Sequence, residues 1–323
     1  MSEGQLVCET LSHRDLADLA GLVETIENFD NPPFRTSARE LERWLTGSGQ
    51  QDSVGWRDGD GRLLAYGHVR LRLLATTVAI CCGGVHPSHR GRGLGEASTS
   101  WQTQRARGLL AEAGVNEGRI ITHVEAADDS FERHLINQGY TWATSYFEMT
   151  RPTRPAPEPV ELDHSIAIVP WDPALDDEVR RALNRMSRDY GAAPLSHDQW
   201  LDTTSHLLTE ASFLALDRST DRSPVAGFVL TSIYSQDWQA LGVRQGAIDM
   251  YGLDGAYTQA NIVEALIVAA VRSFGELGLD SVGISAAAED RAGRAMLARL
   301  GFEVASESRE YVLDVTASRR GDA

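Results

Sequence analysis

Residues 85–95 read VHPSHRGRGLG, which places three glycines and two arginines within six positions. An apolar run precedes this stretch and a helical pattern follows it, so we expect a turn that opens a helix. Unpaired N–H groups at a helix start attract anions, and glycine lets a ligand approach the backbone because it has no Cβ. Arg90 and Arg92 add fork-shaped donors that suit phosphate oxygens. The stretch therefore predicts an anion site, most simply for a pyrophosphate.

Spacing and charge narrow this interpretation. The segment matches neither GxGxxG nor GxxxxGK[ST], so a dinucleotide-binding fold and a P-loop both fit poorly. A flexible glycine-rich turn with solvated arginines is the simpler alternative. The chain as a whole carries 46 acidic and 30 basic residues, a formal net charge of −16. An island of positive charge in so acidic a chain favours a phosphate-bearing ligand.

Other side chains that could do chemistry lie further along the same half. His123 and Glu125 alternate on an expected strand, so they share a face and could relay a proton if that face lines a cleft. His134 lies on the helix that follows. For all three, an ordinary structural or surface role is the alternative. We expect no metal site, because Cys8, Cys81 and Cys82 have neither metal-ligand nor disulfide spacing.

A second acidic group lies near the N-terminus. The stretch ETIENFDNPP, residues 24–33, carries Glu24, Glu27 and Asp30 after the first expected helix. These carboxylates could attract a cationic acceptor, in keeping with the net charge, or could form a solvated helix end. The same net charge argues against nucleic-acid binding, which needs a basic face. No apolar run is long enough to span a bilayer and the N-terminus lacks signal-peptide features, so we expect a cytoplasmic protein without membrane contact.

The elements that must position these residues occur twice. Each half shows an extended piece and a helix, a hairpin-like stretch, an apolar strand, a turn and a long helix. A short strand follows, then a helix that ends in glycine plus an aromatic residue, Gly139–Tyr140 and Gly301–Phe302, and then alternating strands. Strands that alternate with helices indicate a mixed α/β sheet in each half. The proline-rich stretch RPTRPAPEPVE reads as a stiff linker between them. We therefore predict domains at 1–150 and 162–315, a linker at 151–161 and a flexible tail at 316–323.

The pattern V-x-P-x-x-R-G-x-G-x-G resembles the acyl-CoA signature of the GNAT acetyltransferase superfamily. The matching residues are Val85, Pro87, Arg90, Gly91, Gly93 and Gly95. The glycine–aromatic helix ends are also similar to that superfamily, and the duplication resembles its tandem, mycothiol synthase-like members. The resemblance implies an α/β fold in which two central parallel strands splay apart, here near 78–85 and 119–126. It also implies acetyl-CoA as co-substrate, held at Val85 and by residues 90–95, Arg90, Gly91, Arg92, Gly93, Leu94 and Gly95.

The chain departs from the family pattern in both halves. Leu135 stands where a tyrosine often protonates the coenzyme A thiolate, and the strand AICCGG lacks the glutamate that often acts as base. Aligning Leu253 with Val85 places Thr258 at the arginine position, with Gln259, Asn261 and Val263 in place of the three glycines. We therefore expect the second half to keep the fold and to have lost the coenzyme loop. In mycothiol synthase-like proteins the C-terminal copy is the active one, whereas here the intact signature is N-terminal.

The leading hypothesis is an acetyl-CoA-dependent N-acetyltransferase that uses direct transfer in the N-terminal domain. Its acceptor would be a small cationic amine, such as an antibiotic, a polyamine or an amino sugar, and Glu125, His134 and His123 are the candidates for proton transfer. The alternative is a non-catalytic acyl-CoA-binding sensor or regulatory protein, which the departures above favour. We expect a monomer or a homodimer.

Overall fold

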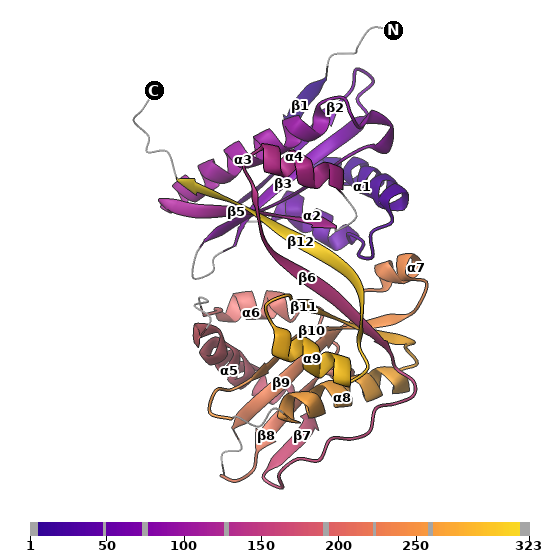
Figure 1. Cartoon of the computed structure of the whole chain (residues 1–323). Coiled ribbons are helices and arrows are strands. Elements are labelled where there is room, and N and C mark those ends of the chain that lie inside the picture. The colour runs from indigo at the N-terminus through magenta and orange to yellow at the C-terminus, as the bar shows by residue number, and fades with distance from the viewer. Residues whose placement is uncertain are drawn as a thin grey trace. The chain divides into compact units, whose positions relative to one another are not determined.

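The computed structural model describes residues 6–47, 50–72, 77–125, 129–189, 194–221, 224–257 and 261–316. The chain divides into two compact units (Figure 1). Unit 1 comprises residues 1–144 together with 308–323, and unit 2 comprises residues 145–307. Within the described residues, no helix is both long enough and apolar enough to cross a membrane.

Unit 1 is a mixed sheet with helices on both faces. Its strands lie in the order β1-β2-β3-β4-β5-β12, and only β4 and β5 are parallel neighbours. The strands are β1 (Val7–Thr10), β2 (Gln51–Arg57), β3 (Leu63–Arg72), β4 (Val78–Val85), β5 (Glu117–Glu125) and the distal part of β12 (Glu303–Thr316). The helices are η1 (His13–Asp15), α1 (Leu16–Asp30), α2 (Ala38–Thr46), η2 (Pro87–His89), α3 (Leu94–Glu112) and α4 (Asp129–Asn137).

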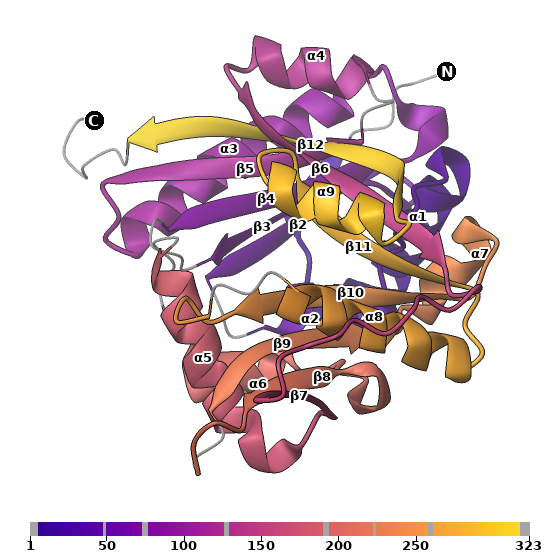
Figure 2. The ribbon, with the colours of Figure 1, turned by 60° about the horizontal axis from the view of Figure 1, so that its bottom comes forward.

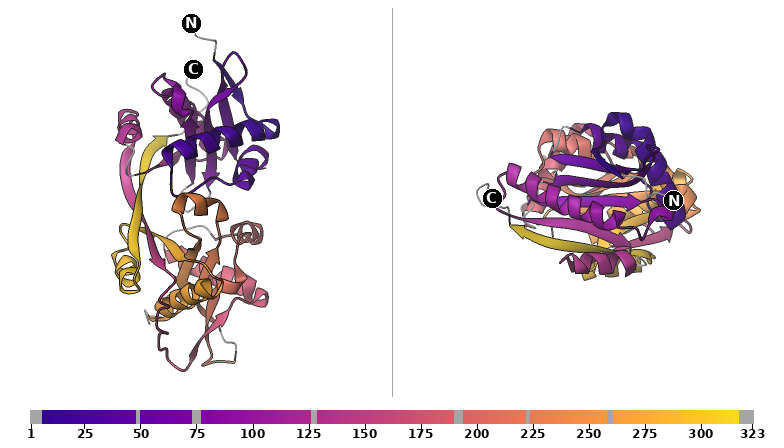
Figure 3. Two further views of the ribbon diagram at one scale, coloured as in Figure 1. Left: turned by 90° about the vertical axis from the view of Figure 1, so that its right-hand side faces the viewer. Right: turned by 90° about the horizontal axis from the view of Figure 1, so that it is seen from above.

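Two apolar layers hold the sheet of unit 1. On one face α3 packs on β4 and β5 through residues such as Leu110 and Ile120. On the other face α1 and α2 bury Leu19 and Leu41 against β3, as the left view of Figure 3 shows for α1. Helix α2 begins at a capping box in which Ser37 and Glu40 satisfy each other's backbone N–H groups. The face between the sheet and the α1–α2 pair is called the α1–α2 face below.

Unit 2 repeats this architecture. Its strands lie in the order β6-β11-β10-β9-β8-β7, again with one parallel pair, β10 and β11. The strands are β6 (Thr141–Pro152), β7 (Ile166–Pro170), β8 (Phe213–Asp217), β9 (Val225–Ser232), β10 (Gln245–Leu253) and β11 (Ser281–Ala287). The helices are η3 (Pro173–Leu175), α5 (Asp176–Asp189), α6 (His197–Thr203), η4 (Thr209–Ala211), η5 (Ser235–Asp237), α7 (Trp238–Leu241), α8 (Asn261–Glu276) and α9 (Arg291–Arg299). Figure 2 shows α8 and α9 beside these strands.

The last strand of each sheet comes from the other half of the sequence. Residues 146–152 of β6 pair with β11, and residues 308–316 of β12 pair with β5. The predicted boundaries 1–150 and 162–315 therefore differ from the two units at both ends. Alternating strands look alike in sequence, and only tertiary pairing decides which sheet each one joins.

The proline-rich stretch predicted as a linker lies within unit 2. Thr153 donates a hydrogen bond to the Leu279 carbonyl (2.7 Å), and Arg272 of α8 donates one to the Pro157 carbonyl (3.0 Å). These contacts hold the extended segment along α8, so residues 153–157 pack on unit 2.

Candidate functional site

The glycine-rich turn of unit 1 joins β4 to α3 and exposes main-chain donors. Gly91 and Gly93 have φ angles of +71° and +85°, a region that glycine occupies without strain. A Cβ at either position would meet no atom within 4 Å, so the backbone is open on its outer side. Among the described residues, no acceptor is recorded for the backbone N–H groups of residues 91–96. Free N–H donors at a helix start are the arrangement that binds anions.

The parallel strands β4 and β5 separate just before this turn. Their register runs from Val78–Arg119 to Ile80–Ile121 and then ends, although β4 continues to Val85. The N–H of His86 donates to the Leu64 carbonyl, so even-numbered residues of β4 direct their backbone groups toward β3. Cys81 therefore still faces Ile121 in the last pair, and Gly83 directs its N–H toward the gap that β5 leaves. We call this gap the β4–β5 opening.

Close docking of α3 positions the turn. A Cβ at Gly83 would lie 2.7 Å from the Tyr66 carbonyl and 2.9 Å from Gln102 Nε2, and a Cβ at Gly67 would lie 2.9 Å from Ser98 Oγ. Ser98 donates to the Tyr66 carbonyl (3.1 Å) and Gln102 donates to the Cys82 carbonyl (2.6 Å). Two cross-strand glycines therefore let the first turns of α3 lie directly on β3 and β4.

Arg90 is held by α1. Its guanidinium forms two hydrogen bonds to the Asp30 carboxylate (2.7 and 2.6 Å) and lies 5.4 Å from the ring centre of Phe29. Its Nε also donates to the Val85 carbonyl (3.2 Å). Arg90 therefore ties the turn to the end of α1, whereas Arg92 is exposed and makes no recorded ion pair in the described part of the chain.

The three residues predicted to attract a cationic acceptor substrate do not form one cluster. Asp30 is committed to Arg90, and Glu27 accepts hydrogen bonds from the Thr36 N–H (2.8 Å) and hydroxyl (2.7 Å). Glu27 thus fixes the segment that joins α1 to α2, while Glu24 is exposed. Their common role as a cationic acceptor site stays a prediction, and the first two have structural partners instead.

The three proton-transfer candidates lie on opposite faces of the sheet. His123 and Glu125 are on the solvent-facing side of β5, whose alternate residues are buried against α3 and α4. His123 Nε2 lies 3.5 Å from Glu310 of β12, and loss of solvent raises the pKa of Glu125 above its usual 4.5. His134 lies on the other face, where its Nε2 is 3.1 Å from Thr99 Oγ1 of α3. Only His123 and Glu125 therefore share a face.

The α1–α2 face of β3 and β4 carries residues that sequence spacing did not single out. Tyr66 and His68 of β3 both stack on Trp44 of α2, with ring centres 6.2 Å and 4.8 Å away. Cys82 and Gly84 are their cross-strand neighbours on β4. A pattern search would miss them because the strand LLAYGHVRLR carries no motif, and only the cross-strand register groups them.

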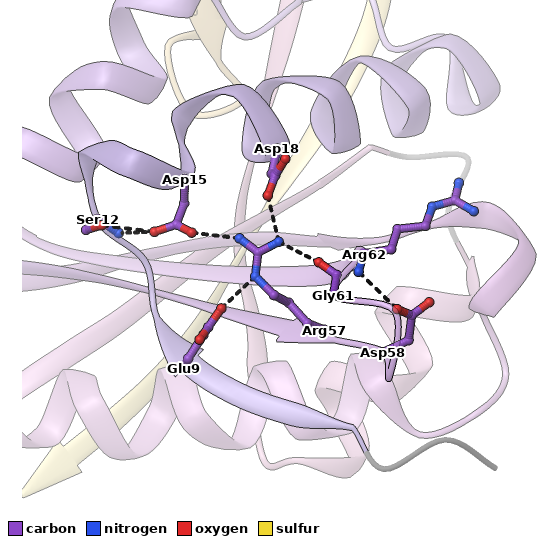
Figure 4. A network of polar contacts seen from close by, with 8 residues as sticks. All are labelled: Glu9, Ser12, Asp15, Asp18, Arg57, Asp58, Gly61 and Arg62. Carbon is purple, nitrogen blue, oxygen red and sulfur yellow. Dashed lines mark hydrogen bonds and ion pairs between the residues drawn. The ribbon is translucent and has the colours of Figure 1, made fainter. Parts of the chain in front are cut away.

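An arginine with three carboxylate partners holds the start of α1 against the β2–β3 hairpin (Figure 4). Arg57 donates to Glu9 (2.5 Å), Asp15 (2.6 Å) and Asp18 (2.7 Å), and also to the Gly61 carbonyl (2.9 Å). Its side chain is only 13% exposed. Because α1 carries Asp30 at its other end, this network also orients the helix that holds Arg90.

Unit 2 retains the strand separation and has a different turn. The pairs between the parallel strands β10 and β11 end at Ile248–Ile284, just as those between β4 and β5 of unit 1 end at Ile80–Ile121. The turn residues Thr258 and Gln259 lie outside the described residues, and α8 begins at Asn261, whose side chain donates to the Glu161 carbonyl (3.0 Å). Beside the separated strands, Asp249 accepts hydrogen bonds from Ser232 and Tyr234. No group of three His, Cys, Asp or Glu side chains able to hold a metal ion occurs within the described ranges.

Comparisons with known proteins agree with this geometry. No family model matches the chain. A mycothiol acetyltransferase from Thermobispora bispora is 26% identical over 224 residues, covering 68% of this chain and 70% of the relative. A GCN5-related N-acetyltransferase from Sphaerobacter thermophilus has a TM-score of 0.74 at 21% identity, covering 96% of both chains. A tandem GNAT protein from the clavulanic acid biosynthesis pathway has a TM-score of 0.70 at 14% identity, covering 96% of this chain and 98% of that one.

The likeness to these solved structures covers nearly the whole chain and includes a tandem GNAT protein, which confirms the resemblance seen in the sequence. The chain therefore has the GNAT acetyltransferase fold in two tandem copies.

Proposed function

We propose that the chain is an acetyl-CoA-dependent N-acetyltransferase whose reaction takes place in unit 1. The observation that carries this proposal is the turn at residues 91–96, where consecutive N–H groups lack acceptors beside the β4–β5 opening. Such donors suit the pyrophosphate of coenzyme A, and the opening suits its pantetheine arm and thioester. Val85, Arg90, Arg92 and Leu94 would complete this binding segment.

The residues around the opening can support direct transfer. An alkyl amine has a pKa near ~10.4, so a base must take its proton before the nitrogen attacks. Glu125 is the strongest candidate, because its raised pKa makes it a better base and it lies on β5 beside the opening. The C–N bond then forms, the C–S bond breaks, and the thiolate takes up a proton. His123 and His134 are secondary candidates.

A covalent acyl-cysteine intermediate fits less well. Burial raises the pKa of the Cys81 thiol strongly and that of the Cys82 thiol to about 12, so neither forms an appreciable thiolate at neutral pH. Attack by the amine on acetyl-CoA itself is therefore the simpler route. The acceptor we propose is a small cationic amine, in line with the net charge of −16.

A non-catalytic acyl-CoA-binding sensor is the second candidate. It is favoured by Leu135, which is 1% exposed in the core where family members often carry a catalytic tyrosine. The two candidates differ in one measurement: release of free coenzyme A thiol from acetyl-CoA in the presence of an amine panel. Turnover with any amine supports the enzyme, and calorimetric binding of acetyl-CoA without turnover supports the sensor.

The assignment to unit 1 is tested by paired substitutions. Arg90→Ala frees the turn from α1 and removes a charge, so we expect acetyl-CoA affinity to fall roughly tenfold. Thr258→Ala, at the aligned position of the second half, should leave the affinity unchanged. Equal losses in the two variants would contradict a single coenzyme site in unit 1.

A further inference from the structure

Tyr66 has a hydroxyl group that the fold does not use. Its side chain is 8% exposed, yet the hydroxyl makes no hydrogen bond to the described part of the chain. The hydroxyl oxygen is not fully buried, because among the described residues the fully buried side-chain polar atoms without a partner are His68 Nε2 and Arg294 Nε. Buried tyrosine hydroxyls usually find a partner, so an unpaired one that still reaches solvent marks a place where a ligand can supply the acceptor.

Gly84 shows where the ring of Tyr66 lies. The two residues are cross-strand partners on β3 and β4. A Cβ at Gly84 would be 3.1 Å from Tyr66 Cε1, an atom next to the carbon that bears the hydroxyl, and 2.8 Å from Ile26 Cδ1 of α1. The ring therefore crosses β4 at a position that only glycine leaves open. Trp44 packs against it at a 26° interplanar angle and helps to hold this orientation.

A ring that starts on β3 and lies over Gly84 extends across β4 in the direction of the β4–β5 opening. The last paired residues, Ile80 and Ile121, share the α1–α2 face, so Cys82 and Gly84 lie on that face of β4 beyond the last pair. By the same alternation His123 and Glu125 lie on it from β5. Tyr66 of β3 and Glu125 of β5 thus lie on one face of the sheet, on the strands to either side of β4.

We propose that Tyr66 is a catalytic residue that donates a hydrogen bond to the carbonyl oxygen of the bound thioester. This inference rests on the proposed function, because it requires the acyl group to lie in the β4–β5 opening. The oxygen has two lone pairs, and the N–H group of Gly83 faces the same opening from the strand itself. A side-chain donor from the α1–α2 face therefore complements the main-chain donor, and both gain strength as the oxygen becomes negative during attack.

The surroundings suit a donor and disfavour a base. Burial, and then the charges of Cys82 and Glu27, raise the pKa of Tyr66 well above its usual 10. The phenol therefore stays protonated across the working pH range. The proton moves from the amine to Glu125 and on to the departing sulfur, so that Tyr66 keeps its own proton throughout the reaction.

The test compares wild type with Tyr66→Phe, which keeps the ring and removes the hydroxyl. We expect the acetyl-CoA dissociation constant to stay within twofold and kcat to fall about 10²-fold, the usual loss for one oxyanion donor. The control is Tyr140→Phe, since Tyr140 is also buried in unit 1 but already bonds Thr103 (3.3 Å). That variant should keep wild-type kcat.

A second readout needs no acceptor amine. The infrared stretch of carbonyl-labelled acetyl-CoA bound to the protein reports hydrogen bonds to the oxygen, and it should move to higher frequency in Tyr66→Phe but not in Tyr140→Phe. Gly84→Ala should produce the same shift, because the added methyl group displaces the Tyr66 ring.

The outcomes separate this inference from the proposed function. Wild type that binds acetyl-CoA without transferring the acyl group would refute the enzyme, while the infrared shift would still support the Tyr66 contact. If Tyr66→Phe binds acetyl-CoA normally and leaves the carbonyl stretch unchanged, the Tyr66 contact is refuted and the proposed enzyme is not. A higher KM for the acceptor at unchanged kcat in Tyr66→Phe would have the same meaning. Failure of wild type to bind acetyl-CoA overturns both.

Discussion

Lowering the pH should destabilise this protein through one histidine. His68 of β3 is 1% exposed and stacked on Trp44, and its Nδ1 lies 2.8 Å from Ser53 Oγ. Its Nε2 is buried and has no hydrogen-bond partner among the residues that the structure describes. Burial, with a smaller effect from the charge of Arg70, lowers the pKa of His68 to about 4 from 6.5. The folded protein therefore holds this imidazole in its neutral form.

The size of the effect follows from proton linkage. The unfolded chain binds a proton at this histidine below pH ~6.5 and the folded chain only below pH ~4, so stability falls as the pH drops between these values. With those two pKa values, the folded state loses about 1.3 kcal/mol between pH 7.5 and pH 5.5 from this group alone. The stability that depends on the neutral His68 imidazole is fully present above pH ~6.5, the pKa of histidine in the unfolded chain.

Urea unfolding of wild type and His68→Asn at the two pH values isolates this contribution. The asparagine keeps a polar partner for Ser53 and does not titrate. Other groups titrate alike in both proteins, so the difference between the two pH-dependent losses should be about 1.3 kcal/mol, with wild type losing more. Equal losses in the two proteins would refute the claim that His68 is buried in its neutral form. A larger loss of unfolding free energy in His68→Asn than in wild type would also contradict the claim, because the effect would then have the opposite sign.

Three further expectations concern the turn, the α1 network and the last strand. Gly93→Ala, at φ +85°, should weaken acetyl-CoA binding several-fold in calorimetry, whereas Gly21→Ala inside α1 has open space and should stabilise the protein by about 0.5–1 kcal/mol. Arg57→Ala should lower the free energy of unfolding by about 1–3 kcal/mol in urea melts, because three carboxylates lose their partner; Arg119→Ala breaks an exposed pair and should cost under about 0.5 kcal/mol. A chain that ends at Glu307 should lose acetyl-CoA binding and resistance of unit 1 to proteolysis, because β5 loses its partner strand, and a chain that ends at Thr316 should keep both.

Much of the fold could be predicted because it depends on local chemistry. The Asp-Gly-Asp-Gly stretch at 58–61 forms the expected hairpin turn, with Asp58 accepting from the Asp60 and Arg62 N–H groups. The repeated order of strands and helices predicted a mixed sheet in each half, and both sheets are present. Periodicity and turn residues act over a few positions, so a sequence displays them directly.

The contacts of individual side chains could not be predicted as well from the sequence. Arg90 could be expected to meet phosphate, yet in the structure it holds Asp30, 60 residues away in sequence. Asp30 and Glu27 were grouped with Glu24 as an acceptor site, yet each of the first two has its own hydrogen-bond partner. Tyr66 drew no attention, because its significance depends on Gly84 across the strand pair.

The sequence by itself determined the turn and the duplication. Gly91 and Gly93 specify left-handed backbone after a strand, and the resulting N–H donors follow from the helix that begins there. Only the tertiary structure decided that β6 completes the sheet of unit 2, that β12 completes the sheet of unit 1, and that the ring of Tyr66 lies over Gly84. The physical reason is that backbone conformation is set by neighbours in the chain, whereas strand pairing and side-chain contacts depend on packing between segments that the chain separates by many residues.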